Sequence, residues 1–162
     1  MIQGFPLVVG EQPKLLILGS MPSVVSLKQQ EYYGFKYNRF WKIMARYFDV
    51  EFDSYEMKLQ TLKKHHIALW DVIGSCEREG SLDSNIHNEE VNPIDQVLKT
   101  YPMLQMVICN GKKSYDLFQK HFHNLDIVVT YLPSTSNANQ TIKEADLFEK
   151  WFAALHKVLK KD

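Results

Sequence analysis

The segment at residues 31–44, EYYGFKYNRFWKIM, combines flat rings, basic side chains and one amide. It holds six aromatic residues, three lysine or arginine residues and Asn38. Aromatic rings stack on flat heterocycles, and an asparagine amide offers both a donor and an acceptor to the edge of a base. The segment is therefore a candidate nucleobase pocket. An alternative is that its rings belong to the core, because apolar residues recur from Phe40 at the offsets of three and four that mark the buried stripe of a helix.

Signatures of other common catalytic sites are absent from the sequence. The segment GSMPS at residues 19–23 lacks the second glycine and the lysine–serine pair of a phosphate loop, and no G-x-S-x-G elbow occurs. The six histidines form no recognisable metal set, and the paired motifs of zinc nucleobase deaminases are missing. The two cysteines, Cys76 and Cys109, are too few for a disulfide scaffold or a four-cysteine metal site, and we expect both to be buried thiols. We expect no metal and no cofactor.

Length and composition predict one compact domain spanning residues 1–162. With 162 residues and 45% hydrophobic content, the chain is close to the common domain size of roughly 100–150 residues. It contains no apolar run of about 18 residues and no signal-peptide pattern at its start. We therefore expect a cytoplasmic protein, without a membrane partner, that acts as a monomer.

Charge is balanced overall but concentrated locally. The formal net charge is zero, which argues against a purely electrostatic binder of nucleic acid. Residues 24–48, however, carry one acid, Glu31, against five basic residues: Lys28, Lys36, Arg39, Lys42 and Arg46. A local basic face of this kind holds a phosphate backbone while the remaining surface stays neutral. A solvated helix face explains the same charges equally well.

Alternating strand and helix patterns predict a three-layer α/β/α sandwich around a central parallel sheet of four strands. Near-continuous apolar runs, typical of strands buried on both faces, occur at residues 14–19, 66–74, 103–111 and 125–133. Helical patterns occur at residues 38–48, 54–65, 92–101, 112–122 and 143–161. Ser54 and Asn92 are the expected N-caps of the second and third of these helices. The alternation is that of βαβ units.

Polar loops follow all four predicted strands. In an open parallel sheet, ligands bind beyond the carboxyl ends of the strands. These ends carry GSMPS, DVIGSCEREGSLDS, CNGKK and LPSTSNAN. We therefore expect the four loops to meet at one crevice that is rich in small hydroxyls and amides.

Five blocks in this chain resemble, in order and spacing, the motifs of the uracil-DNA glycosylase superfamily. They are LLILGSMPS, YYGFKYNRFWKIM, ALWDVIGSCEREGSLDSNI, ICNGKKSYDLF and YLPSTSNAN. The chain is most similar to the DNA-deoxyinosine (hypoxanthine-DNA) glycosylase branch, over about residues 14–140. The resemblance implies a four-stranded parallel sheet and a monofunctional enzyme that flips a deaminated base out of DNA and hydrolyses its N-glycosidic bond. It implies no cofactor.

The resemblance also implies roles for individual residues. Asn38 matches the asparagine credited with catalysis in this branch, although such an asparagine often only caps a helix. Tyr33 matches an aromatic residue that stacks on the flipped base, with a packed ring as the alternative. Asp71 occupies the place of an asparagine that reads the base edge, so it either accepts a hydrogen bond from the base or assists the water. The first block implies that the base is bound by Gly19, Ser20, Met21, Pro22 and Ser23.

Met21 departs from the pattern of several relatives, which carry at this position an aspartate or asparagine that places the attacking water. A thioether neither orients nor deprotonates water, so another polar residue has to do so. The last block implies contacts with DNA, in which hydroxyls bind phosphates and Asn137 reaches the minor groove, and the basic segment adds Arg39. The predicted DNA-binding set is Arg39, Ser134, Thr135, Ser136 and Asn137.

The sequence thus predicts a DNA glycosylase acting on hypoxanthine first and uracil second, with DNA that contains deaminated bases as its partner. Two alternatives stay open. One is a mismatch-specific uracil or thymine glycosylase. The other is a non-catalytic nucleic-acid-binding module, which Met21 makes a serious rival.

Overall fold

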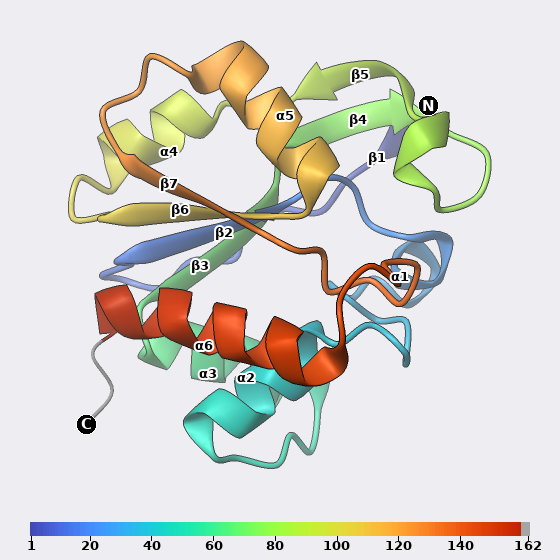
Figure 1. Ribbon diagram of the computed structural model, residues 1–162. Helices are drawn as coiled ribbons and strands as arrows, with labels where there is room; N and C mark the ends of the chain where they lie inside the picture. Colours follow the sequence, from blue (N-terminus) through green and yellow to red (C-terminus); the bar gives the residue numbers. More distant parts are fainter. Residues whose placement is uncertain (160–162) are drawn as a thin grey trace.

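A central parallel sheet organises the molecule, whose computed structural model describes residues 1–159 (Figure 1). The four strands lie in the order β3-β2-β6-β7, and all neighbouring pairs are parallel. Their bounds are β2 (Leu15–Gly19), β3 (Ile67–Asp71), β6 (Met106–Asn110) and β7 (Val128–Leu132). Every residue of β2 and β6 is buried, as expected for strands covered on both faces. The predicted α/β architecture with four parallel strands is confirmed.

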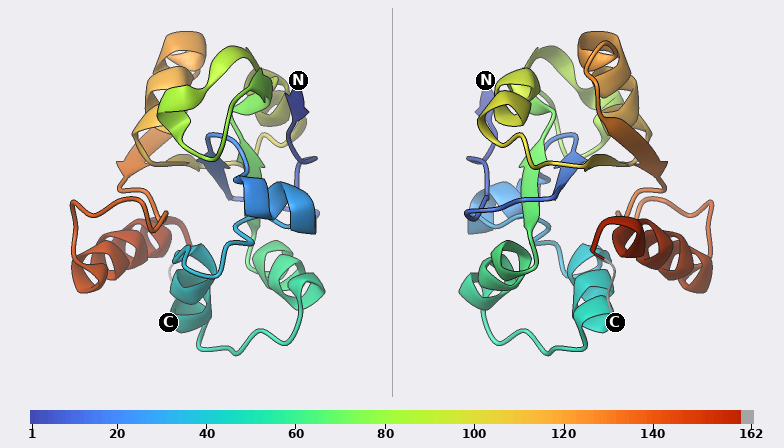
Figure 2. Two further views of the ribbon diagram at one scale, coloured as in Figure 1. Left: turned by 90° about the vertical axis from the view of Figure 1, so that its right-hand side faces the viewer. Right: turned by 90° about the vertical axis from the view of Figure 1, so that its left-hand side faces the viewer.

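One face of the sheet is covered by α2 (Phe40–Phe48), α3 (Tyr55–Lys64) and α6 (Glu144–Leu159), as Figure 2 shows. Leu15 and Ile17 of β2 turn toward this layer and share a core with Phe40 and Trp151. The side chain of Ser54 accepts a hydrogen bond from the Met57 amide, so the predicted N-cap of α3 is confirmed.

The opposite face is covered by α4 (Ile94–Thr100) and α5 (Lys112–Phe122). Leu16 and Leu18 of β2 point to this side and share a second core with Phe118. The prediction that Asn92 is the N-cap of α4 is wrong, because the N-cap is Pro93. The side-chain amide of Asn92 instead donates to the main-chain oxygen of Asp71 at 2.8 Å.

A second, smaller sheet was not predicted. It is antiparallel, in the order β1-β4-β5, and its strands are β1 (Ile2–Gln3), β4 (Ile73–Glu77) and β5 (His87–Val91). The run at residues 66–74, expected to be one strand, divides at Val72. Its amide donates to the main-chain oxygen of Gly19, and that of Ile73 donates to Ser20, so the chain crosses the end of β2 before it enters the second sheet.

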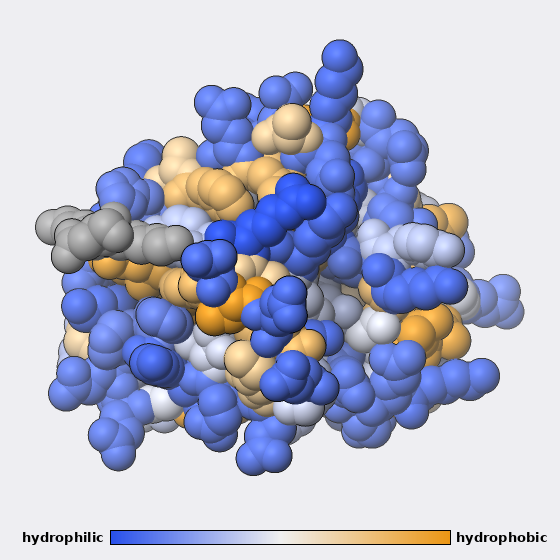
Figure 3. All heavy atoms as spheres, turned by 90° about the horizontal axis from the view of Figure 1, so that it is seen from below, coloured by the Kyte–Doolittle hydropathy of each residue, from blue (hydrophilic) through white to orange (hydrophobic). Residues whose placement is uncertain are grey.

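Two short helical segments complete the fold near the carboxyl ends of the parallel strands. Helix α1 (Val24–Gln29) was not predicted, and it is capped by the side chain of Ser23, which accepts from the Ser26 amide at 3.2 Å. The 3-10 helix η1 (Asp83–Asn85) lies between β4 and β5. Figure 3 shows the face formed by α2, α3 and α6, where hydrophilic residues predominate and apolar patches lie between them. Within residues 1–159, no helix is both long and apolar enough to cross a membrane.

Candidate active site

A cavity of about 510 Å³ opens at the carboxyl ends of the parallel strands. The last residues of β2, β3 and β6 all line it; they are Gly19, Asp71 and Asn110. The loop that follows β7 lines it as well, through residues 134–139. The expected crevice is therefore present, and polar residues from the ends of all four strands meet in it.

The first loop, GSMPS, forms one wall through its backbone and small side chains. Gly19 has no room for a side chain, because a Cβ atom there would lie 2.5 Å from Asp71 Oδ1 and 3.0 Å from the Tyr33 hydroxyl. The loop therefore approaches the carboxyl and the phenol closely only because it begins with glycine. Met21 is 8% exposed and packs in the core on the α5 side, so the sulfur at this position serves packing.

The segment before β5 holds the first loop in place. The Ser20 hydroxyl donates to Asp83 Oδ1 at 2.7 Å, and the Arg78 guanidinium donates to the main-chain oxygen of Pro22 at 2.6 Å. The Ser81 hydroxyl accepts from the Val24 amide at 2.9 Å. Three contacts between segments far apart in the sequence thus fix the wall of the cavity.

Tyr33 lines the cavity from the segment before α2. Its ring stacks on Phe40 with 4.2 Å between centroids and an interplanar angle of 22°. The residue has a left-handed backbone (φ 53°), and its hydroxyl accepts from the Asn110 amide at 3.1 Å. Burial raises the pKa of the phenol, so Tyr33 stays neutral at physiological pH. The ring predicted to stack on a base is placed in the cavity and backed by a second ring.

Asn38 is held by its oxygen. Its Oδ1 accepts from the Phe40 amide at 2.9 Å and from the Thr135 hydroxyl at 2.9 Å. The first of these bonds fixes which end of the amide is oxygen, since a main-chain N–H requires an acceptor. Helix α2 begins at Phe40, two residues later than expected, and its N-cap is Arg39, so Asn38 precedes the N-cap position. The Nδ2 group has no partner among the described residues, so Asn38, which lines the cavity, offers donors there.

Asn110 and Thr135 bond to each other and hold Asn38 in place through the Thr135 hydroxyl. The Asn110 amide nitrogen donates to Thr135 Oγ1 at 3.0 Å, and its oxygen accepts from the Thr135 amide at 3.0 Å. The phosphate contact predicted for Thr135 does not fit the structure, because the residue is fully buried and its hydroxyl bonds inside the protein. Asn110 was not among the residues predicted from the sequence, although a polar residue that ends the apolar run VICN was a usable signal.

Asp71 stands at the floor of the cavity. The residue is 4% exposed, and its Oδ2 atom is buried without a hydrogen-bond partner. Burial raises the pKa of this carboxyl to about 7; the negative charge of Asp83 adds to the rise and the Arg78 guanidinium opposes it. A carboxyl group in this state is poised between its neutral and charged forms at physiological pH.

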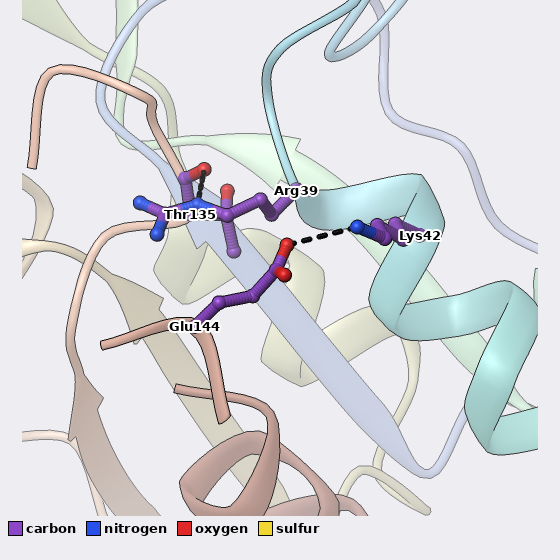
Figure 4. Close-up of polar contacts among 4 residues, drawn as sticks. All are labelled: Arg39, Lys42, Thr135 and Glu144. Atoms are coloured by element: carbon purple, nitrogen blue, oxygen red, sulfur yellow. Dashed lines mark hydrogen bonds and ion pairs between the residues drawn. The ribbon is translucent and has the colours of Figure 1, made fainter. Parts of the chain in front are cut away.

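Arg39 joins α2 to the loop after β7, as Figure 4 shows for part of this contact. Its guanidinium donates to the main-chain oxygens of Thr135 at 3.2 Å and Ser136 at 2.6 Å. Beside it, Lys42 pairs with Glu144 at 3.0 Å. Arg39, Lys42 and Glu144 line a second hollow of about 280 Å³ next to the main cavity. Arg39 thus shapes the loop, whereas Lys28, Lys36 and Arg46 are exposed.

The remaining predicted contacts with DNA lie on the rim. Ser134 and Ser136 are partly exposed and Asn137 is exposed, and all three line the cavity. The Ser134 and Ser136 hydroxyls accept from main-chain amides two residues later, which stiffens the loop. Within residues 1–159, no group of three or more histidine, cysteine or acidic side chains is arranged to hold a metal ion. Cys76 and Cys109 are buried free thiols, as predicted.

The fold and the cavity define an α/β protein whose site, at the ends of four parallel strands, presents amides, hydroxyls, one buried carboxyl and a backed aromatic ring. Comparison with known proteins identifies the family. The model of the uracil DNA glycosylase superfamily matches residues 6–156. This chain belongs to that superfamily, and the resemblance seen in the five sequence blocks is confirmed.

Proteins with similar sequences match most of the chain. It is 38% identical over 140 residues to a protein from Methanosarcina acetivorans named "Hypoxanthine DNA glycosylase", which covers 85% of this chain and 88% of that protein. It is 36% identical over 140 residues, with the same coverage, to a protein of the same name from Methanosarcina barkeri. A solution NMR structure from M. acetivorans, described as a candidate uracil DNA glycosylase, superposes with a TM-score of 0.85 at 35% identity and covers 96% of this chain and 97% of that one.

Proposed function

We propose that this protein is a DNA glycosylase that removes deaminated bases, hypoxanthine first and uracil second, and so initiates base excision repair. The observation that carries the proposal is a cavity lined by all the predicted catalytic and base-binding residues in a chain 38% identical to a protein named hypoxanthine DNA glycosylase. A base inside a duplex is out of reach of such a cavity, so the nucleotide has to be flipped out of the stack.

The size and lining of the cavity suit a purine. Its volume of about 510 Å³ lies within the range of roughly 300–1,000 Å³ typical of small-molecule pockets. Tyr33 supplies the flat surface on which the base stacks, and Phe40 behind it keeps the ring from moving away. The backbone and hydroxyls of residues 19–23 surround the base edge.

Asn38 positions the attacking water through its Nδ2 group. Both hydrogen bonds of Oδ1 are used inside the protein, so the amide cannot rotate freely and its N–H donors keep one direction. A donor that holds the water oxygen leaves a second lone pair for attack on the anomeric carbon. Placing a weak nucleophile in this way is enough where the sugar already has oxocarbenium character, and positioning alone contributes several kcal/mol to catalysis, of order 7–11 at most.

DNA is held at the rim of the cavity. Ser134, Ser136 and Asn137 offer hydroxyls and an amide to the backbone beside the flipped nucleotide. Lys28 and Lys36 are exposed on the same basic segment and attract phosphates. Arg39 contributes by shaping the loop that carries the three rim residues.

Single-turnover incubation with end-labelled duplexes tests the proposal. Matched duplexes carry inosine, uracil, a G/T mismatch or no lesion, with and without a chelator. We expect alkali-labile sites in the inosine duplex, fewer in the uracil duplex, and no loss of activity with chelator. Preferential cleavage of the mismatch would make the protein a mismatch-specific enzyme instead. Binding to inosine DNA without any cleavage would make it a non-catalytic module.

A further inference from the structure

Asp71 is a buried carboxyl without a partner at the floor of the cavity. It lines the cavity, yet its Oδ2 atom is buried and receives no hydrogen bond from the described residues. An ionised carboxylate in that position loses its hydration without gaining donors, which is unfavourable by several kcal/mol in proteins. The burial of Oδ2 without a donor therefore favours the neutral form of Asp71 over the carboxylate.

The cavity offers the leaving base little other assistance. The ionisable side chains among its described lining residues are Tyr32, Tyr33, Asp71 and Asp83. Burial raises the pKa of both tyrosines, so neither is a proton donor near neutral pH. Burial raises the pKa of the Asp83 carboxyl, but the hydrogen bond that it accepts from the Ser20 hydroxyl opposes the rise and stabilises the carboxylate. Since no lysine, arginine or histidine is among these residues, a purine anion formed here would meet no cation.

We propose that Asp71, as a neutral carboxylic acid, donates its proton to N7 of the departing hypoxanthine. This assignment rests on the proposed glycosylase function. The C1′–N9 bond breaks with both electrons moving to the purine, which takes the proton from Asp71 and leaves as neutral hypoxanthine. Water held by Asn38 then adds to the oxocarbenium carbon and loses a proton to the Asp71 carboxylate. The acid is restored, and the net reaction consumes one water for each base released.

The charged groups around Asp71 shift the pKa of its carboxyl. Asp83, from η1, raises the pKa of the Asp71 carboxyl, and Arg78, from the end of β4, lowers it. Tyr32 and Tyr33 face the carboxyl from the segment before α2 and stay neutral. With a pKa of about 7, the acid form is present below neutrality and is lost as the pH rises. This is the range in which a general acid works best at physiological pH.

The test compares the wild type with Asp71→Asn in single-turnover excision of inosine from about pH 5 to pH 9. The wild-type rate should fall as the pH rises through about 7. Asp71→Asn has nearly the same shape and can still donate a hydrogen bond, but it has no proton to transfer. Its rate at low pH should be about 10²–10⁴-fold lower and independent of pH.

A second substrate separates proton transfer from structural damage. In 7-deazainosine a carbon replaces N7 while the remaining edges of the base are unchanged. Wild type and Asp71→Asn should excise this base at nearly equal, slow rates. Equal affinity of both proteins for a non-cleavable 2′-fluorinated inosine duplex serves as the control for folding and binding.

Several results would overturn the assignment. They are a wild-type rate that rises with pH, an Asp71→Asn profile that parallels the wild type, or an Asp71→Asn defect of equal size on inosine and 7-deazainosine. The wild-type profile alone is decisive should the variant fail to fold. If the wild type excises no inosine at any pH, the proposed function fails together with this assignment, whereas normal excision with any of the three results removes the role of Asp71 alone.

Discussion

Asn38 makes two separable contributions, and replacing it tests them independently. Its Oδ1 atom accepts two hydrogen bonds, one from the Phe40 amide and one from the Thr135 hydroxyl, each 2.9 Å long. Its Nδ2 group is the one proposed to hold the water. Alanine removes both contributions, whereas aspartate keeps an acceptor oxygen in place of Oδ1 and replaces the N–H donors with a second acceptor.

The expected loss of stability follows from the two bonds. Each contributes about 1 kcal/mol net, so Asn38→Ala should destabilise the protein by about 2 kcal/mol. For a chain of this size, about 1 kcal/mol lowers Tm by roughly 2–4 °C. Asn38→Ala should therefore melt about 4–8 °C below the wild type. Asn38→Asp should melt close to it, helped by a negative charge at the start of α2.

Excision should respond differently from stability. If the N–H donors place the water, both variants should lose about 10²-fold in the single-turnover rate of inosine excision, because misplacing a reactant by about 1 Å has an effect of that size. Affinity for inosine DNA should change little, since the loss is confined to the transition state. Melting and excision are measured on the same preparations.

Two outcomes would refute this reasoning. An Asn38→Ala protein that is less stable but excises at the wild-type rate would show that Asn38 contributes only to stability. An Asn38→Asp protein with the wild-type rate would show that an acceptor serves as well as a donor, and the Nδ2 assignment would be wrong.

Three further perturbations follow from the geometry. Gly19→Ala should destabilise the protein by about 1–3 kcal/mol, because its Cβ would lie 2.5 Å from Asp71 Oδ1; unchanged stability in urea unfolding would contradict the close contact. The wild type should lose stability relative to Asp71→Asn as the pH rises from about 4 to 7, because the Asp71 carboxyl keeps its proton in the folded state after the unfolded chain has released it. At about 1.4 kcal/mol per pKa unit, the full effect on the free energy of unfolding is up to about 4 kcal/mol. Parallel curves of unfolding free energy against pH for the two proteins would refute this prediction. Glu144→Gln should strengthen DNA binding by freeing Lys42, and should steepen the slope of log affinity against log salt by about 0.9; an unchanged slope in anisotropy titrations would show that Lys42 reaches no phosphate.

The parallel sheet was predictable because its strands carry a strong signal. Strands buried on both faces have to be apolar at nearly every position, and the segments LLILG and MVICN are fully buried. The antiparallel sheet was not predictable in the same way. The strand HNEEV is largely exposed and has no apolar alternation, so what holds it is pairing with β4 and not its own pattern.

The cavity residues were predictable by type, but their bonding was not. Asp71 was predictable because it ends a buried strand, and Tyr33 was predictable because it lies in a segment rich in aromatic rings. The second hydrogen bond that holds Asn38 Oδ1 comes from Thr135, a residue 97 positions away in the sequence. The same long-range contact removed Thr135 from the predicted DNA contacts. The local sequence shows which polar groups are present, whereas contacts in the folded protein determine which of their atoms are free to bind a ligand.

The position of Met21 connects these observations. The family resemblance implies that several relatives carry a carboxylate or amide at this position to place the water, but here the side chain is Met21, which packs in the core on the α5 side. Gly19, in the same loop, has no room for a Cβ atom beside Asp71 and Tyr33. Burial raises the pKa of the Asp71 carboxyl. In the proposed reaction, the buried Asp71 therefore serves as the acid for the leaving base, and Asn38, whose Oδ1 accepts from the Thr135 hydroxyl, holds the water in place of a side chain from the first loop.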